Sequence, residues 1–272
     1  MPELPEVETI RRTLKPLILN KKIEAIEVFY DRIIDGDTQE FIQILTGQTF
    51  RDIDRVGKYL IFKLDQDAFI SHLRMEGKYF VVKKEEPIRK HCHVIFHLDQ
   101  NIDLRYEDTR KFGRMQLVSL DYYKQEKPLN KLGKEPFDID PKILYQSLKK
   151  IQRPIKEVLL DQSLILGIGN IYANEICFKM KINPNAPANH LTLKRTKELV
   201  QVACEILNEA IEQGGTTIHT FSANGIDGLF QVRLNVHGKQ GQPCPICKRP
   251  IEKIKIGGRG TYYCKHCQRK TY

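Results

Sequence analysis

The chain has 272 residues and a formal net charge of +10, and 41% of its residues are hydrophobic. This length allows one large domain or two to three smaller ones, with enough apolar residues for real cores. No apolar run approaches the roughly 18 residues of a membrane span, and the acidic N-terminus lacks the apolar stretch of a secretory signal. Four of the seven cysteines cluster near the C-terminus, which favours a metal site over disulfides and predicts a reducing, cytoplasmic setting.

The first half of the chain has the pattern of a strand-rich domain. Apolar spacing predicts a helix over residues 5–15, which Pro16 should end or disturb, and a second short helix near Phe41. Many short strands follow at regular spacing, which predicts a sandwich or barrel with a helix or two attached. The predicted strands cover residues 23–30, 49–56, 59–64, 68–73, 79–83, 93–98, 102–106 and 114–119.

The second half has the pattern of a helical domain followed by a small basic module. A proline- and glycine-containing linker over residues 128–141 comes before the helices, and a polar segment at 216–229 is expected to be a mobile loop. The predicted helices cover residues 143–150, 155–161, 171–180 and 193–213. Residues 232–272 then hold ten Lys or Arg and one acidic residue, Glu252. A basic module on a nearly neutral body is typical of nucleic-acid binders, although a solubilising tail is the simpler alternative.

The basic module contains a strong metal-binding pattern. Its cysteines follow the spacing C-x2-C-x16-C-x2-C, so that two matched pairs can present four thiolates to one ion. Four protein ligands leave no position for water, and the pattern therefore predicts one structural Zn²⁺ rather than a catalytic one. Between the pairs, residues 253–261 alternate and then turn on glycine, which predicts a two-stranded ribbon with Arg259 at its tip. The predicted ligands are Cys244, Cys247, Cys264 and Cys267.

The N-terminus offers a possible nucleophile. Pro2 follows Met1 directly, and removal of Met1 would leave a secondary amine whose pKa lies near working pH. Such an amine can attack an electrophilic carbon and form an iminium, as lysine Schiff bases do. Glu3 and Glu6 could supply acid–base chemistry beside it. The simpler alternative is that the prolines and acidic residues only open a helix.

Three loops are weaker candidates, and for each a structural role is the simpler alternative. Residues 167–171 form a glycine-rich turn that opens a helix and could bind phosphate. Residues 108–113 combine a cation and an aromatic at what is predicted to be a hairpin tip, and residues 73–77 end a strand at a turn. An exposed Met or Phe in such loops could act as a wedge between bases.

Together these motifs resemble those of the bacterial formamidopyrimidine-DNA glycosylases, the base-excision enzymes for oxidised purines, along the whole chain. The resemblance implies an α+β multidomain fold. It places a catalytic β-sandwich with flanking helices at residues 1–130, a helix–two-turns–helix domain at 131–229 and a β-hairpin zinc finger at 230–272. The motifs that carry it are residues 2–6, 57–60, 72–77, 108–113, 167–172 and the zinc finger with 258–261.

The resemblance also implies roles for individual residues. Pro2 would be the nucleophile, Glu3 the acid that assists opening of the sugar, and Lys58 and Arg259 would support catalysis at the phosphates. The segment 216–229 would close over the everted purine. The implied DNA contacts are Met75, His91, Arg110, Phe112, Lys156 and Asn170. The implied partner is damaged double-stranded DNA, bound by a monomer in the bacterial cytoplasm at the nucleoid.

Two other interpretations remain open from the sequence. Endonuclease VIII, the sister family for oxidised pyrimidines, shares Pro2, Glu3 and the zinc finger, but it usually has Gly where this chain has Leu4. A non-catalytic zinc-finger DNA-binding protein would explain the basic module, but it would leave Pro2, Glu3 and Lys58 without a purpose.

Overall fold

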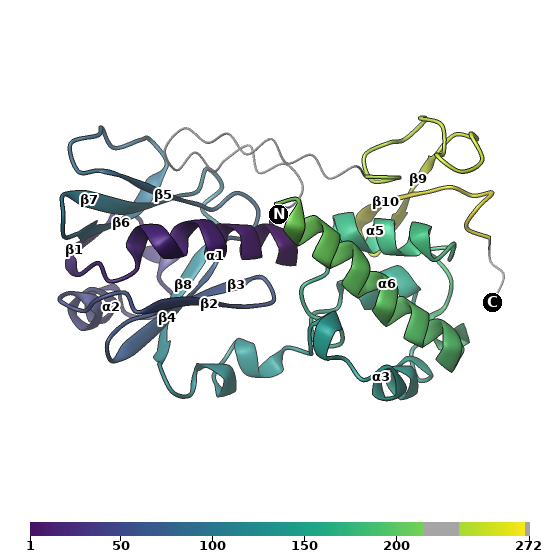
Figure 1. The fold of residues 1–272 in the computed structure, drawn as a ribbon, viewed down its shortest axis with the longest axis horizontal. Helices are drawn as coiled ribbons and strands as arrows, with labels where there is room; N and C mark the ends of the chain where they lie inside the picture. The colour runs from purple at the N-terminus through teal and green to yellow at the C-terminus, as the bar shows by residue number, and fades with distance from the viewer. Residues whose placement is uncertain (215–233, 270–272) are drawn as a thin grey trace. The chain divides into compact units, whose positions relative to one another are not determined.

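The computed structural model describes residues 1–214 and 234–269, and the chain divides into two compact units (Figure 1). Residues 1–130 form the main part of the first unit, and residues 131–213 together with the C-terminal segment form the second. The segment 216–229, predicted to be a loop, lies outside the described residues. Within the described part of the chain, none of the helices has the length and apolar character needed to cross a membrane.

The first unit is built on two four-stranded antiparallel sheets, which confirms the predicted β-sandwich. One sheet has the order β1-β6-β7-β5 and the other β2-β3-β4-β8. Short apolar or alternating runs located these strands to within a few residues, because every strand contributes buried side chains to the core. The strands are β1 (Ile23–Val28), β2 (Asp52–Val56), β3 (Tyr59–Lys63), β4 (Asp67–His72), β5 (Lys78–Lys83), β6 (Cys92–Leu98), β7 (Ile102–Glu107) and β8 (Arg114–Ser119).

The prediction that residues 108–113 form a hairpin tip is wrong. The strands on either side of it, β7 and β8, belong to different sheets, so the segment is a crossover rather than a hairpin turn. Residues 73–77 likewise connect β4 in one sheet to β5 in the other. Local sequence cannot distinguish the two cases, since a hairpin and a crossover can both follow from two strands joined by a short polar loop.

Aromatic rings form the centre of the sandwich core. Phe62 stacks on Phe69 with ring centroids 4.6 Å apart, and Phe69 stacks on Phe96 at 5.3 Å. Phe62 and Phe69 come from β3 and β4, whereas Phe96 comes from β6 in the other sheet. Stacked pairs of this kind add about 0.5–1.5 kcal/mol each beyond the burial of their area, and the Phe69–Phe96 pair joins the two sheets.

Two helices flank the sandwich. Helix α1 (Leu4–Ile18) continues through Pro16, so its predicted end at residue 15 is wrong. Pro16 lies in the last turn and lacks an N–H to donate there, but the buried side chains of Leu14 and Ile18 hold that turn on the core. Helix α2 (Thr38–Leu45) is capped by Asp37, whose carboxylate accepts the backbone N–H of Glu40. A short 3-10 helix, Asp31–Ile33, lies between β1 and α2.

The second unit contains the predicted helices and the zinc-finger ribbon. Its α-helices are α3 (Pro141–Leu148), α4 (Ile155–Leu160), α5 (Asn170–Lys179) and α6 (Leu193–Glu212). The ribbon consists of β9 (Glu252–Ile256) and β10 (Arg259–Tyr263), which pair in antiparallel fashion. Short 3-10 helices lie just before the predicted linker (Tyr123–Gln125), within it (Leu129–Lys131 and Pro136–Asp138) and in one later loop (Ala188–His190).

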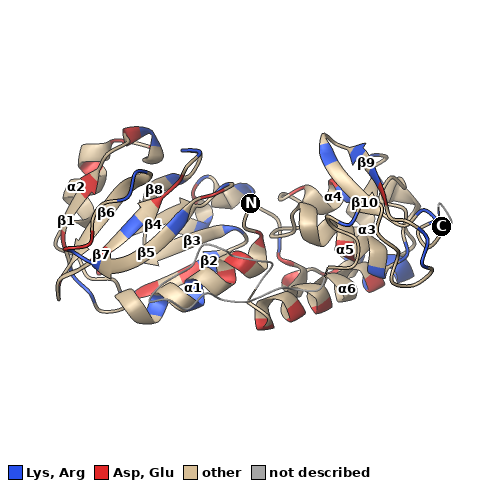
Figure 2. Cartoon of the chain, turned by 90° about the horizontal axis from the view of Figure 1, so that it is seen from above, with Lys and Arg blue, Asp and Glu red and all other residues tan. Residues whose placement is uncertain are grey.

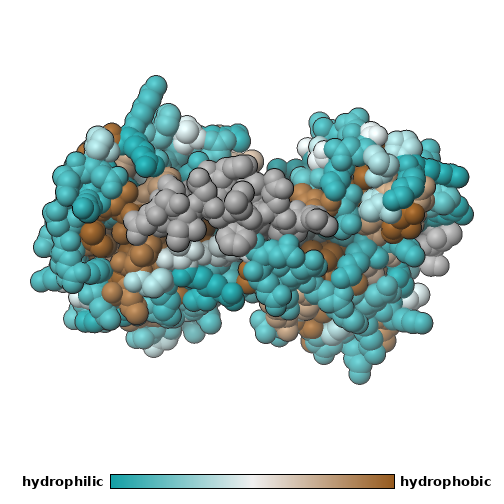
Figure 3. Space-filling model, turned by 45° about the horizontal axis from the view of Figure 1, so that its top comes forward, coloured by the Kyte–Doolittle hydropathy of each residue, from teal (hydrophilic) through white to brown (hydrophobic). Residues whose placement is uncertain are grey.

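Charged residues are distributed differently over the elements of the two units. Helices α1 and α6 carry both acidic and basic residues, whereas the charged residues around β9 and β10 are mostly basic (Figure 2). Hydrophilic residues cover most of the visible surface of each unit, with smaller apolar areas between them (Figure 3). The basic surface therefore belongs to the ribbon and its neighbours, as the charge of residues 232–272 predicts.

Candidate functional site

The start of α1 fixes two buried carboxyl groups close in sequence to Pro2. Glu3 is the N-cap residue, and its side chain accepts a backbone N–H of the first turn, while the Glu3 backbone N–H donates to Oε2 of Glu6 over 2.8 Å. This reciprocal capping box satisfies two helix-end donors. Glu3 and Glu6 are only 2% and 3% exposed, whereas Pro2 is half-buried and Met1 is exposed. Glu6 therefore has a structural task in the cap, in addition to the acid–base role considered for it.

Lys58 lies in the two-residue turn that joins β2 to β3. Gly57 precedes it with φ 58°, and glycine is favoured at the first position of such a hairpin turn because this conformation is strained for other residues. Lys58 is only 5% exposed, so the turn holds an ammonium group in a largely buried place. A buried Lys at the edge of a sheet is an unusual feature that points to a function rather than to solubility.

His72, at the end of β4, is a neutral neighbour of this lysine. Burial, together with the positive charges of Arg74 and Lys58, lowers the pKa of His72 to about 3. Its Nδ1 accepts the backbone N–H of Arg74 over 2.9 Å, which leaves the ring proton on Nε2. The edge of the sheet thus presents two cations and a neutral imidazole donor, a combination suited to anionic groups.

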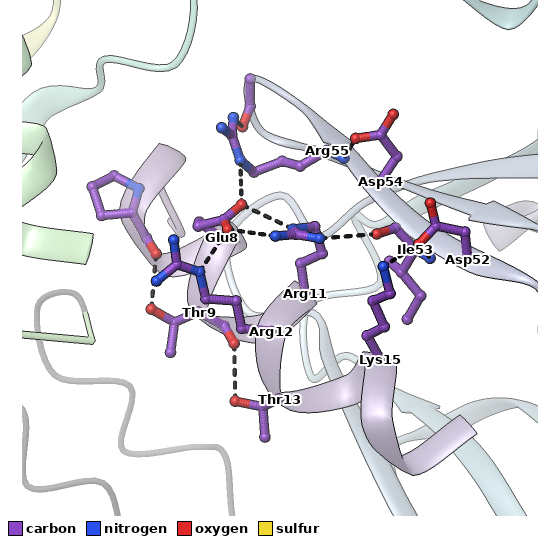
Figure 4. A network of polar contacts seen from close by, with 12 residues as sticks. Glu8, Thr9, Arg11, Arg12, Thr13, Lys15, Asp52, Ile53, Asp54 and Arg55 are labelled. Atoms are coloured by element: carbon purple, nitrogen blue, oxygen red, sulfur yellow. Dashed lines mark hydrogen bonds and ion pairs between the residues drawn. The ribbon is translucent and has the colours of Figure 1, made fainter. Parts of the chain in front are cut away.

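A carboxylate with three arginine partners lies one turn further along α1 (Figure 4). Glu8 Oε1 accepts from Nη2 of Arg11 and Nε of Arg12, both over 2.8 Å. Glu8 Oε2 accepts from Nε of Arg11 and Nε of Arg55, both over 3.0 Å. Burial disfavours the charged form of Glu8, but these hydrogen bonds outweigh burial and lower its pKa to about 2.

This network predicts a measurable acid sensitivity. The pKa of Glu8 falls from an ordinary value of 4.5 to about 2 on folding. Its stabilisation is therefore complete above pH 4.5 and is lost as the pH falls towards 2. We expect Glu8→Gln to lower the free energy of unfolding by about 2 kcal/mol at pH 6, and the difference from the unchanged protein to shrink below pH 4.

Thermal unfolding of both proteins at pH 6, 4 and 3, followed by circular dichroism, checks this expectation. Glu24→Gln is the matched control, because Glu24 pairs with Lys84 at the surface. A difference for Glu8→Gln that stays constant across this pH range would contradict the assignment.

The crossover at residues 108–113 is organised by one buried carboxylate. Asp108 accepts the backbone N–H groups of Arg110 (2.9 Å), Phe112 (2.9 Å) and Gly113 (2.8 Å). Three such bonds hold the loop in one conformation with its side chains directed outward. Phe112 is 48% exposed, and the Arg110 guanidinium lies over its ring at 4.8 Å from the centroid. The exposed Phe112 ring and the Arg110 guanidinium therefore form a cation–π pair at the surface of the loop.

The second crossover packs against the first. The hydroxyl of Thr109 donates to the carboxylate of Glu76, and both Gly77 and Gly113 pack on the hydroxyl of Tyr106. A Cβ at Gly77 would lie 2.3 Å from that oxygen, so only glycine fits there. Met75 is half-buried in this second crossover. The structure thus brings Met75 and the Arg110–Phe112 pair to the same end of the sandwich.

His91 is placed next to the same loop. Its backbone carbonyl accepts the N–H of Asp108 over 3.0 Å, and its side chain is half-buried. The following β6 residue His93 contributes a further bond, with Nε2 2.8 Å from the Asp108 carbonyl. The backbone of His91 is therefore fixed next to the loop that carries Arg110 and Phe112. The role expected for the His91 side chain is a contact with DNA.

In the second unit, two polar side chains meet the ribbon of the zinc finger. The buried Nζ of Lys156, on α4, donates to the Gly260 carbonyl (3.1 Å) and to Oγ1 of Thr261 (2.6 Å). Nδ2 of Asn170, at the start of α5, donates to the same carbonyl over 3.2 Å. Arg259 is exposed immediately before this anchored pair. Lys156 and Asn170 therefore hold the segment that presents Arg259.

The turn of the ribbon explains its glycines. Gly257 and Gly258 both have positive φ, 54° and 74°, as the favoured two-residue hairpin turn requires. A Cβ at Gly257 would also lie 2.9 Å from Cγ of Glu157 on α4, so the turn rests closely on that helix. The predicted ribbon with Arg259 beside its turn is confirmed.

The four cysteines of the module converge as the spacing predicted. Their sulfur atoms all lie within 4.8 Å of one another, with Cys244 Sγ 3.9 Å from Cys267 Sγ and Cys247 Sγ 3.5 Å from Cys264 Sγ. A tetrahedral ion with bonds of about 2.3 Å would separate its sulfur ligands by about 3.8 Å. The cluster is therefore consistent with one structural zinc. Of the remaining cysteines, Cys92 and Cys177 are buried and Cys204 is partly exposed.

The sequence interpretation missed two residues that shape the site, Glu8 and Arg55. The spacing of Glu8 to Arg11 and Arg12 on one helix was a visible signal of ion pairing. Arg55 gave no such signal, because its contact with Glu8 depends on the fold. The first unit therefore carries one group of expected residues: Pro2, Glu3, Lys58, Met75, His91, Arg110 and Phe112. The second carries another: Lys156, Asn170, Arg259 and the four cysteines.

Comparison with known proteins identifies the family. Residues 1–115 match the formamidopyrimidine-DNA glycosylase N-terminal domain, residues 132–222 its H2TH domain, and residues 241–269 the zinc finger found in FPG and IleRS. Formamidopyrimidine-DNA glycosylases of Lactobacillus delbrueckii and Bacillus licheniformis are 45% and 46% identical, and each alignment covers 99% of this chain and 100% of the relative.

Solved structures agree with the sequence relatives. A complex of a Lactococcus lactis FPG mutant with a Fapy-dG containing DNA has a TM-score of 0.94 and 42% identity, covering 99% of this chain and 100% of that one. A complex of Lactococcus lactis Fpg with an abasic site containing DNA has a TM-score of 0.91 and 40% identity, covering 98% and 100%. Because the relatives match over their full length, the chain belongs to the formamidopyrimidine-DNA glycosylase family.

Proposed function

We propose that this protein is a bifunctional DNA glycosylase and abasic-site lyase of base-excision repair. It removes oxidised purines, 8-oxoguanine and formamidopyrimidines, from duplex DNA and cleaves the abasic strand. The observation that carries the proposal is the Pro2–Glu3 start of α1, with its buried carboxyl, in a chain about 45% identical along its length to enzymes of this name. Family members crystallised with Fapy-dG and abasic-site DNA support the choice of substrate.

The chemistry begins at the N-terminal amine. Once Met1 is removed, the Pro2 nitrogen attacks C1′ of the damaged nucleotide and a new N–C1′ bond forms. The bond to the base breaks, and the base leaves with the bonding electron pair and takes up the proton that the Pro2 nitrogen gives up. Glu3 gives a proton to the ring oxygen of the sugar as the ring opens, which leaves an iminium between Pro2 and C1′. The iminium stabilises loss of a proton from C2′, and the two phosphates leave in successive β- and δ-eliminations.

The other site residues bind and shape the DNA. Lys58, Asn170 and Arg259 anchor phosphates around the lesion, with Lys58 and Arg259 supporting the catalytic step, while His91 and Lys156 assist binding. Lys156 acts through the Gly260 and Thr261 contacts that hold Arg259 in place. The zinc is structural and supplies no step of the reaction.

A flipped nucleotide leaves a gap that must be filled. Met75, Arg110 and Phe112 occupy it, and Arg110 reads the orphaned base. These roles divide among a catalytic sandwich at residues 1–130, a helical DNA-binding domain at 131–229 and a zinc finger at 230–272. The protein acts as a monomer in the bacterial cytoplasm, at the nucleoid.

A nicking assay tests this function against its rivals. The substrates are one duplex carrying 8-oxoguanine opposite cytosine, one carrying an oxidised pyrimidine such as thymine glycol, and one undamaged. We expect rapid cleavage of the first only. Preference for the oxidised pyrimidine would support an activity like that of endonuclease VIII, and binding without cleavage of any duplex would support a non-catalytic DNA-binding protein.

Arg110→Ala is expected to relax recognition of the base opposite the lesion. A good bidentate contact to a base contributes about 1–3 kcal/mol of discrimination, so the ratio of excision rates opposite cytosine and adenine should narrow by roughly tenfold. The control is Lys111→Ala, because the Lys111 ammonium lies over the Tyr30 ring, 4.6 Å from its centroid, and is committed to the protein. An unchanged cytosine-to-adenine ratio in Arg110→Ala would show that another residue reads this base.

A further inference from the structure

We propose that Glu8 and Arg55 are positioning residues that hold the Lys58 turn in register with the N-terminal end of α1, which carries Pro2 and Glu3. The inference rests on the proposed function, since it concerns the geometry of that reaction. The ion-pair network around Glu8 would then affect the rate of the reaction as well as the stability of the fold. The network lies entirely in the first unit, and its members are visible in Figure 4.

Arg55 forms a bridge between the helix and the turn. Its Nε donates to Oε2 of Glu8 over 3.0 Å, and its Nη1 donates to the Gly57 carbonyl over 3.1 Å. The side chains of Arg55 and Glu8 are only 11% and 8% exposed. The Gly57 carbonyl belongs to the peptide group that joins Gly57 to Lys58. Arg55 therefore fixes the orientation of the peptide from which the Lys58 side chain starts.

The helix carries this restraint to the N-terminus. Glu8 lies five residues after Glu3 on the same helix, about 7.5 Å along its axis. The capping box fixes the first turn of α1, so Glu8 and Glu3 belong to one rigid element. Any shift of the turn relative to Glu8 would therefore also shift Lys58 relative to Pro2 and Glu3.

The three arginines around Glu8 are not equivalent. Arg12 is 59% exposed, and within the network it contacts Glu8. Arg11 also donates to the Ile53 carbonyl on β2 over 3.3 Å, which fastens the helix to the strand rather than to the turn. Arg55 alone among them contacts the turn. Two arginines already balance the charge of Glu8, and burial of the Arg55 guanidinium costs desolvation free energy. A role for Arg55 beyond charge balance is therefore favoured.

Alignment of this kind matters for catalysis more than for folding. A displacement of about 1 Å in a reacting or supporting group can lower a rate by about a hundredfold, while the fold remains intact. The Lys58 turn has one glycine in the left-handed region, and the Arg55–Gly57 bond restrains the peptide group that follows this glycine.

The test is a double-mutant cycle between Arg55→Ala and Lys58→Ala, measured as the single-turnover rate of 8-oxoguanine excision at saturating enzyme. Arg55→Ala is expected to lower this rate by about tenfold in the unchanged protein and by less than about twofold in the Lys58→Ala background. A purely structural role for Arg55 would lower the rate by the same factor in both backgrounds and would overturn the inference.

Arg12→Ala is the matched control, because it removes one hydrogen bond to Glu8 and leaves the turn untouched. It should leave the rate within about twofold of the unchanged protein. An equal loss in Arg12→Ala and Arg55→Ala would also overturn the inference. Should Arg55→Ala fail to fold, the same cycle is run with Arg55→Lys, which keeps the charge but loses the forked geometry that reaches two acceptors.

The outcomes separate the inference from the function on which it rests. An unchanged protein that excises no 8-oxoguanine would overturn the proposed function itself. An active unchanged protein with additive effects in the cycle would overturn only the positioning role. Melting temperatures of all variants, measured in parallel, distinguish a loss of rate from a loss of folded protein.

Discussion

Blocking the N-terminal amine is expected to abolish strand cleavage. A protein that retains Met1, or that carries an N-terminal tag, presents no secondary amine at Pro2 and cannot form the iminium. We expect the rate of lesion cleavage to fall by about a thousandfold or more, because a covalent route through the amine is lost altogether. Binding to lesion-bearing DNA should persist, since the capping box and the ribbon anchored by Lys156 are unchanged.

Borohydride trapping gives the direct measurement. Reduction of the iminium converts it to a stable amine, so enzyme and DNA should run as one covalent species on a denaturing gel. The matched control carries the same tag at the C-terminus, where the amine stays free, and it should form the adduct at the normal rate. Pro2→Gly, which keeps a primary amine, should retain a remnant of the activity. Cleavage at an undiminished rate by the N-terminally blocked protein would disprove the mechanism, because the proposed reaction starts at that nitrogen.

The sequence predicted the elements of the sandwich well, because each strand leaves its own local pattern. In β3 and β4 the buried residues, such as Phe62 and Phe69, form short continuous runs, and such runs are visible without knowledge of the partner strands. Which strands pair is a different question. The crossover that carries Arg110 resembled a hairpin because its two flanking strands are close in sequence, although they lie in different sheets.

The residues of the candidate site likewise differ in how far the sequence could predict them. Pro2–Glu3 and the paired cysteines are linear motifs whose chemistry follows from residue type and spacing. The contacts of Arg55 and Lys156 are not linear: Glu8 lies 47 residues from Arg55, and Gly260 lies 104 residues from Lys156. A side chain that acts through a distant carbonyl leaves no pattern in the sequence, and only the fold shows that Lys156 meets the ribbon.

Removal of one zinc ligand is expected to unfold the ribbon and to weaken DNA binding. In Cys244→Ser three thiolates remain, and the closed tetrahedral site is lost. Cys244 is fully buried and packs with Phe178, Val236 and Ile251, so the same substitution also disturbs the small apolar core of the module. Structural zinc supplies about 10–16 kcal/mol of apparent binding energy to modules of this kind, more than such a core can replace.

Loss of the zinc should weaken DNA binding because it disrupts the ribbon. Without it, the Gly260 carbonyl and the Thr261 hydroxyl no longer hold Lys156, and Arg259 is no longer presented beside them. We expect affinity for lesion-bearing duplex to fall by about a hundredfold at physiological salt, because several phosphate contacts are lost together. The sandwich should stay folded, since its core is separate and contains none of the four cysteines.

Metal analysis and binding measurements check both parts. The unchanged protein should contain one zinc per chain, Cys244→Ser much less, and circular dichroism should still report the strands of the first unit. Cys204→Ser is the matched control, since Cys204 lies on α6, outside the cluster, and the same chemical change there should leave zinc content and affinity unaltered. A purified unchanged protein without zinc would contradict the metal site. Full affinity in a zinc-free Cys244→Ser protein would show that the ribbon is not needed to hold the DNA.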